Sequence, residues 1–138
     1  MFRKILVAVD GSRHASAALA LAVDLAQRYS ASLCLLHAFP HVSDLLGTPY
    51  HEDLLAARTT IGRQLLEAAR MQAGEALPVE TQLVEGPPAP AILRAAEEGD
   101  YDLVVLGSRG HGKIAGLLLG STSSAVAQHA GCPVLLVH

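Results

Sequence analysis

The sequence predicts an α/β fold, a single open parallel five-stranded sheet with helices on both faces. Three observations support this. Five short strand candidates alternate strictly with four helical patterns. Four of the strand candidates are nearly continuous apolar runs, as expected of parallel strands buried on both faces. The remaining one, over residues 79–84, alternates apolar and polar residues, which is typical of an edge strand with one wet face.

The first half of the chain predicts two strand–helix units. The first strand is expected over residues 4–9, which are uniformly apolar after Lys4. A capping cluster, Asp10-Gly11-Ser12, precedes a helix that runs to about Tyr29. A second strand over 32–38 and a loop over 40–49 lead to a helix over about 52–73. Its predicted apolar side consists of Leu54, Leu55, Ile61, Leu65 and Ala69.

The second half predicts the edge strand over 79–84 and a helix over about 90–97. A fourth strand is expected over 102–106, a fourth helix from near Ser121 until Gly131 stops it, and a fifth strand over 132–137. Right-handed crossovers leave few topologies, and we expect the strand order 3-2-1-4-5, which places the alternating strand at an edge. Ligands bind such sheets at the switch point between strands one and four. The loops after Val9 and Leu106 then open onto the same crevice.

The bulk composition indicates one globular domain over residues 1–138. Apolar residues make up 51% and charged residues 17% of the chain, and the net charge is −3. We find no basic stripe with interleaved aromatics, so nucleic-acid binding is not expected. No apolar run approaches the roughly 20 residues of a membrane span, and we expect a cytoplasmic protein. Cys34 and Cys132 lie in apolar runs as predicted buried thiols, and no spacing of ligand residues predicts a metal site.

A glycine-bearing segment follows the fourth strand. Gly107 and Gly110 are followed, after nine residues, by Gly120-Ser121 at the predicted start of the last helix. Glycines allow a ligand to approach the backbone, and the first N–H groups of a helix lack intrahelical partners and attract anions. We interpret this arrangement, ending in a Ser-capped helix, as a phosphate site. The alternative is that the glycines only shape a long loop.

With these residues in view, the whole chain resembles the universal stress protein family. The resemblance lies in residues 4–12 (KILVAVDGS), residues 102–112 (DLVVLGSRGHG), and Gly120-Ser121 followed by residues 132–137 (CPVLLV). The ATP-binding group of that family carries Gly, two residues, Gly, nine residues, Gly, then Ser or Thr. This sequence matches at every position, and the resemblance implies a Rossmann-like fold that binds ATP, with AMP or ADP as alternatives and Mg²⁺ as an accompanying ion.

The resemblance also implies roles for individual residues. Asp10 would accept hydrogen bonds from the ribose, Ala38 would meet adenine through its backbone, and Gly107 would allow the ribose or phosphates to approach. Arg109 and Lys113 are not fixed by the motif; they could offset phosphate charge or simply be solvated. The full set expected to bind the nucleotide is Ala8, Val9, Asp10, Ala38, Leu106, Gly107, Arg109, Gly110, Gly120, Ser121 and Thr122, the phosphates being held by Gly110, Gly120 and Ser121.

Other chemistry is disfavoured, and no catalytic residue is predicted. The first loop lacks the GxxxxGK[ST] of a P-loop, and the glycines at 110, 112 and 116 do not have the position of a dinucleotide fingerprint. Asp10, Ser12 and His14 are more simply a helix cap than a hydrolytic triad. His37 is interpreted as a satisfied, partly buried histidine. His41 and His51 flank a loop and could contact a ligand or a metal, but their spacing matches no metal motif. His111, in the glycine loop, is solvated by default, with phosphate contact as the alternative.

Three functions follow, in order of preference. The first is an ATP-binding regulatory protein of the stress response. The second is a slow ATP hydrolase, which would need a positioned base that we cannot identify. The third is a dimeric interaction protein with a vestigial site, although the glycines are all retained. We also expect a homodimer through residues 132–137, because this edge strand is apolar and shows no polar alternation. The alternative is that the last helix and His138 shield that edge within one chain.

Overall fold

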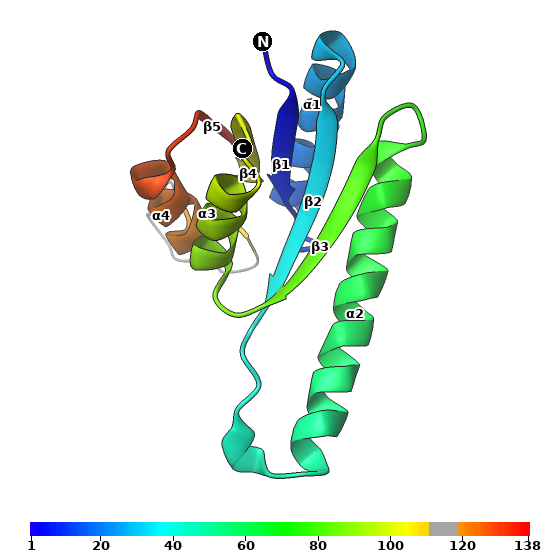
Figure 1. The fold of residues 1–138 in the computed structure, drawn as a ribbon, viewed down its shortest axis with the longest axis vertical. Coiled ribbons are helices and arrows are strands. Elements are labelled where there is room, and N and C mark those ends of the chain that lie inside the picture. The colour runs from blue at the N-terminus through cyan, green and yellow to red at the C-terminus, as the bar shows by residue number, and fades with distance from the viewer. Residues whose placement is uncertain (111–118) are drawn as a thin grey trace.

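The computed structural model describes residues 1–110 and 119–138, and it confirms the predicted parallel sheet with the order β3-β2-β1-β4-β5. The sheet twists through the centre of the molecule, and both ends of the chain lie near its upper part in Figure 1. The elements are β1 (Lys4–Ala8), α1 (Arg13–Tyr29), β2 (Ser32–Phe39), the 3₁₀ helix η1 (Asp44–Leu46), α2 (Tyr50–Ala73), β3 (Val79–Glu85), α3 (Pro88–Glu98), β4 (Leu103–Gly107), α4 (Ser121–His129) and β5 (Val134–Val137).

Helices cover both faces of the sheet. On one face, α1 and α2 pack against alternate residues of the central strands, among them Ile5 and Val7 of β1. On the other face, α3 and α4 pack against the opposite residues, among them Leu6 and Val104. All four of these strand side chains are fully buried. Since alternate residues of a strand point to opposite faces, both apolar sets of one strand are used, which explains the continuous apolar runs.

The largest difference from the predicted elements concerns α2. Its buried residues are Gly62, Leu66, Ala69 and Ala73, whereas Ile61, which we expected on the buried side, is 62% exposed. The helix starts at Tyr50, earlier than expected, and its N-terminal half extends beyond the end of the sheet (Figure 1). The sheet is still present at this level, since a Cβ on Gly62 would meet Leu83 of β3. Ile61 lies about 100° round the helix axis from Gly62 and so outside the buried face, and the expectation for Ile61 was wrong.

Smaller differences lie at element ends. β5 begins at Val134 because Pro133 has no N–H to donate, although its carbonyl still accepts from Val104 N–H. Helix α3 begins at Pro88, where proline suits the first helical turn. Cys34 is buried as expected, and burial raises the pKa of its thiol, but Cys132 is only half-buried. No helix in the described part of the chain is long and apolar enough to cross a membrane.

Candidate functional site

A cavity of about 250 Å³ lies at the carboxyl ends of β1, β2 and β4, and α3 and α4 complete its walls. This is the switch point of the sheet: the chain passes from β1 to β2 on one side and returns from β3 to β4 on the other side of β1. All eleven residues predicted to bind a nucleotide line this cavity. The residues that line it and that the sequence reasoning missed are Leu36, Pro88, Ile92, Leu119 and Ser123.

One end of the cavity is apolar. Leu36 and Ala38 of β2 and Ala8 of β1 supply its floor, and Pro88 and Ile92 from the first turns of α3 supply its cover. Ile92 is 1% exposed and belongs to the core cluster on this face. The predicted topology could have indicated that α3 covers the cavity, because the helix that joins edge strand β3 to β4 must cross over β2 and β1. The result is an apolar slot between the strand ends and a helix.

Ala38 presents backbone groups to this slot. β1 ends at Ala8, and Val9 N–H donates to Leu36 C=O at 2.9 Å. In a parallel pair, alternate residues of a strand turn their N–H and C=O toward the same neighbour. The N–H and C=O of Ala38 therefore point to the β1 side, beyond the point where β1 has ended. A donor and an acceptor next to an apolar slot can recognise the edge of a heterocyclic base.

The other end of the cavity is polar and contains Asp10. Its Oδ1 accepts from Ser12 N–H at 2.9 Å, and the Ser12 hydroxyl accepts from Ala15 N–H at 3.2 Å as the N-cap of α1. The capping cluster is therefore confirmed for Ser12, while Asp10 stabilises the turn before it. Asp10 Oδ2 lies 2.6 Å from the position that a Cβ on Gly110 would occupy. The carboxylate thus fills the space that the absence of a side chain at Gly110 leaves.

The three glycines of the motif have different surroundings. A Cβ on Gly107 would lie 2.7 Å from His14 Cβ and 2.8 Å from His14 C, so close packing of β4 on α1 requires this glycine. A Cβ on Gly120 would have ordinary contacts of 3.5 Å with Arg109 Cα and Ser108 O. Gly120 has φ −73° and ψ 168°, a backbone conformation that any residue adopts. Neither the backbone conformation nor the neighbours of Gly120 within the protein require a glycine, so its missing side chain serves to leave space in the cavity.

The expected Ser cap of the last helix was wrong. The N-cap of α4 is Gly120, and Ser121 is the first helical residue. Because glycine has no side chain, no cap hydrogen bond reaches the first turn from this position. The first N–H groups of an α-helix have no intrahelical acceptor and lie at the positive end of the helix dipole. The polar end of the cavity therefore presents donors from Ser121 and Thr122.

Cations near this end come from the loop after β4. Arg109 lines the cavity and is half-buried. The other cation considered from the sequence, Lys113, lies outside the described residues, as do His111 and the glycines at 112 and 116. A guanidinium beside helix N–H groups adds positive potential, so the polar end suits an anion.

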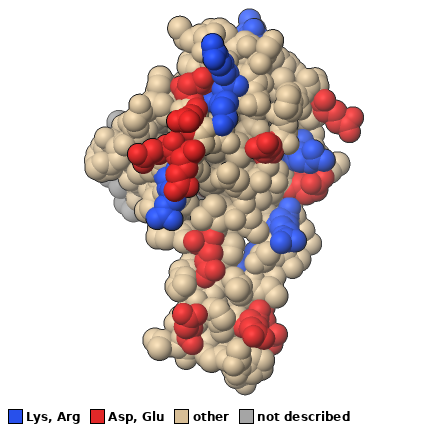
Figure 2. Space-filling view, in the orientation of Figure 1, with Lys and Arg blue, Asp and Glu red and all other residues tan. Residues whose placement is uncertain are grey.

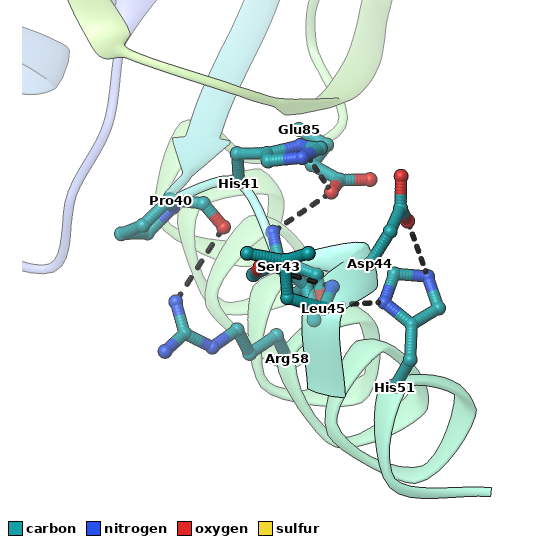
Figure 3. Close-up of polar contacts among 9 residues, drawn as sticks. Pro40, His41, Ser43, Asp44, Leu45, His51, Arg58 and Glu85 are labelled. Atoms are coloured by element: carbon teal, nitrogen blue, oxygen red, sulfur yellow. Dashed lines mark hydrogen bonds and ion pairs between the residues drawn. The ribbon is translucent and has the colours of Figure 1, made fainter. Parts of the chain in front are cut away.

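The remaining histidines considered from the sequence lie away from the cavity lining. His37 is half-buried and its Nδ1 lies 2.8 Å from Val9 C=O, which confirms its interpretation as a satisfied residue. In the projecting segment drawn in Figure 3, His41 Nδ1 lies 2.9 Å from Glu85 Oε1, and His51 contacts Ser43 C=O. Among the described residues, no three His, Cys, Asp or Glu side chains lie close enough together to hold a metal ion.

The face drawn in Figure 2 mixes acidic and basic side chains, with several acidic residues at its lower end. A continuous cationic stripe of the kind that tracks a nucleic-acid backbone is not visible on this face. The positive electrostatic potential of the cavity instead lies at its polar end. In the described part of the chain it comes from the first turn of α4 and the Arg109 guanidinium, which suits a small anionic ligand.

Comparison with known proteins finds a family match over the whole chain. The model of the universal stress protein family matches residues 1–138. A universal stress protein of Thermus aquaticus, named for its position 3′ of a QAH/OAS sulfhydrylase, is 43% identical over 99% of both chains. The structure of UspA from Lactobacillus plantarum superposes with a TM-score of 0.79 at 29% identity, covering 99% of this chain and 98% of that one. A universal stress protein crystallised in complex with cAMP gives a TM-score of 0.75 at 28% identity, covering 99% and 97%.

Proposed function

This chain belongs to the universal stress protein family, and we propose that it is a regulatory protein of the stress response that binds adenine nucleotide and senses ATP. In this proposal residues 1–138 form one nucleotide-binding domain that acts in the cytoplasm. It binds a small anionic ligand and neither nucleic acid nor membrane.

The observation that carries the proposal is the division of one cavity into an apolar and a polar end. A nucleotide has the matching parts in the same order, a flat base, a ribose with hydroxyl groups and anionic phosphates. The base fits between β2 and α3, where Ala38 offers a backbone donor and acceptor. Asp10, in the polar end, would accept from the ribose hydroxyls. The phosphates then reach Gly110, Arg109 and the first turn of α4.

One argument favours an adenine base and another favours a triphosphate. The relative crystallised with cAMP carries an adenine nucleotide on the same fold at 28% identity. The polar end also offers donors from two sources, the N–H groups of the first turn of α4 and the Arg109 guanidinium, which can bind phosphates at different points of a chain. That arrangement favours ATP over AMP.

The cavity also fits an accompanying Mg²⁺. This ion keeps several waters and is usually bound by one or two carboxylates together with substrate phosphates. Among the described residues that line the cavity, Asp10 is the carboxylate. Asp10 and the phosphates would hold the ion, which would neutralise phosphate charge.

Thermal unfolding with different ligands tests the proposal. At about 100 times its Kd, ATP should add roughly 2.7 kcal/mol to the free energy of unfolding. AMP and GTP at the same concentration should add less, because AMP uses fewer donors and guanine presents a different edge to Ala38. Equal shifts with ATP, GTP and inorganic triphosphate would refute adenine recognition. Mass spectrometry of the nucleotide released from freshly purified, denatured protein gives an independent answer.

ATP hydrolysis is the second candidate function. A hydrolase needs a group that orients or deprotonates water beside the terminal phosphate. Asp10, the carboxylate in the described lining, is bonded to Ser12 N–H at the ribose position of the cavity. We therefore rank binding above hydrolysis. Release of phosphate in multiple turnovers, lost in Asp10→Asn, would reverse that order.

We further propose that two copies associate through β5. All four residues of β5 are only half-buried apolar residues, whereas the other edge strand, β3, exposes Glu80, Thr81 and Gln82. An uncovered apolar edge strand promotes association, and polar residues on an edge oppose it. A twofold partner that packs on β5 would bury this edge in an isologous contact. This interface is a further feature of the proposed regulatory protein.

A further inference from the structure

The backbone carbonyl of Ser108 joins the end of β4 to the start of α4. It accepts from Gly120 N–H at 2.7 Å and from the Ser123 hydroxyl at 2.7 Å. Ser108 N–H donates to Val137 C=O at 2.8 Å, so the same residue is also tied to β5. One residue thus connects β4, α4 and β5 directly beneath the polar end of the cavity.

The Ser123 side chain of this contact is enclosed. Ser108 is 1% exposed and Ser123 is 2% exposed. The Ser123 hydroxyl has a second acceptor, Gly120 C=O, at 3.1 Å, and the shorter contact is the one to Ser108 C=O. Since a serine hydroxyl carries a single proton, this donor is already used within the protein. Ser123 therefore acts on the protein backbone.

We infer that Ser123 is a positioning residue for the phosphate end of the cavity. This inference rests on the proposed nucleotide binding. The hydroxyl holds the first turn of α4 against the end of β4, so that the N–H groups of Ser121 and Thr122 keep a fixed direction before a ligand arrives. Ser123 lies outside the glycine motif, and the sequence pattern did not single it out.

Hydrogen-bond geometry explains why a fixed direction matters. Good N–H···O bonds require a donor–acceptor distance of about 2.7–3.2 Å and a nearly straight angle. A helix start that samples several positions offers this geometry only part of the time. The observed dissociation constant rises in inverse proportion to the competent fraction, so a fraction reduced to a tenth raises it about tenfold.

Ser123→Ala removes the hydroxyl with little risk to the fold. Val126, one turn later in α4, is fully buried and anchors the helix independently. Alanine is also a strong helix former at this position. Ser124→Ala is the matched control, because Ser124 is a half-buried serine of the same helix that does not line the cavity. Ser123→Thr tests rescue because it keeps the hydroxyl.

The experiment measures the affinities for ATP and for adenosine by calorimetry in all four proteins. Ser123→Ala should raise the dissociation constant of ATP about tenfold and leave that of adenosine within about twofold, because adenosine has no phosphate. Ser124→Ala and Ser123→Thr should keep the wild-type ratio of the two constants. An unchanged ratio in Ser123→Ala would overturn the inference.

Amide hydrogen exchange in the nucleotide-free protein separates positioning from direct phosphate contact. Ser123→Ala should accelerate exchange of Gly120 N–H, which shares its acceptor with the lost hydroxyl. Unchanged exchange together with weaker ATP binding would show a direct contact and overturn positioning. A wild-type protein that binds neither ATP nor adenosine would instead overturn the proposed function on which the inference rests.

Discussion

Gly107→Ala is expected to destabilise the folded protein by about 3 kcal/mol, although the exchanged group is a single methyl at the edge of the cavity. The new Cβ would lie 2.7 Å from His14 Cβ, 2.8 Å from His14 C and 3.0 Å from Ala15 N. Two of these three atoms belong to the backbone in the first turn of α1. They can move only if α1 shifts relative to β4.

The magnitude follows from what surrounds the clash. Extra methyl groups in a packed core usually cost about 1–3 kcal/mol, and rigid backbone neighbours favour the upper end of that range. Residue Ser12, which caps α1, is itself buried, so the start of the helix has little freedom. For a domain of this size, about 3 kcal/mol corresponds to a melting temperature lowered by roughly 10 °C.

Gly120→Ala is the matched control for thermal unfolding followed by circular dichroism. Its Cβ would have contacts of 3.5 Å, so the expected cost is about 1 kcal/mol or less, from the weaker capping preference of alanine. In Gly110→Ala the clash is with Asp10 Oδ2, the end of a side chain that can turn away. Turning away would break the bond of Asp10 Oδ1 to Ser12 N–H, so that variant should lose about 1 kcal/mol of stability, less than Gly107→Ala, and should lose nucleotide affinity. The reasoning fails if Gly107→Ala melts no lower than Gly120→Ala.

Four further predictions follow from the structure. In calorimetry, Asp10→Ala should weaken the binding of ATP more than the binding of inorganic triphosphate. It should also cost about 1 kcal/mol of stability through the lost hydrogen bond to Ser12 N–H. A loss of stability with unchanged affinities would show that Asp10 only stabilises the turn before α1. Gly120→Val should fold, because the backbone there suits β-branched residues, and fail to bind ATP in equilibrium dialysis; normal binding would refute the phosphate assignment. Leu136→Lys should sediment as a monomer where the wild type is a dimer, and a monomeric wild type at high micromolar concentration, with or without ATP, would refute the β5 interface. Because the Cys34 side chain is buried and Cys132 is half-buried, alkylation of Cys34, followed by mass spectrometry, should be the slower of the two. Burial raises the pKa of the Cys34 thiol, so this thiol should lower stability as the pH rises above about 8.5, where the unfolded thiol ionises first.

The strand order was predictable because local signals mark the strands and one edge, and the handedness of crossovers leaves few arrangements of them. Continuous apolar runs mark strands that are covered twice, and the alternation over residues 79–84 marks an edge. The buried side of α2 could not be found in this way. The apolar residues of this helix cover a wide arc, and periodicity did not reveal that the face turned to the sheet contains Gly62 and Leu66. Ile61 and Leu66 are both apolar, but Leu66 lies on the face that Gly62 turns to β3, whereas Ile61 lies outside that face.

The cavity lining was predictable where it comes from loops at strand ends, and less so where it comes from a helix face. The residues after β1 and β4 carried explicit signals, a carboxylate and spaced glycines. Ile92 carried none, since an apolar residue in an amphipathic helix predicts only burial. Ser123 was missed because its partner is a backbone carbonyl, which leaves no trace in the sequence.

The surroundings of the three motif glycines show which of them the packing of the protein itself requires. Gly107 is required by the contact of β4 with α1, and Gly110 by the carboxylate of Asp10. Both requirements exist without any ligand. Gly120 differs, because neither its φ and ψ nor its neighbours within the protein forbid a side chain. Its bare backbone borders the polar end of the cavity, so Gly120 is the glycine of the motif whose missing side chain a bound phosphate best explains.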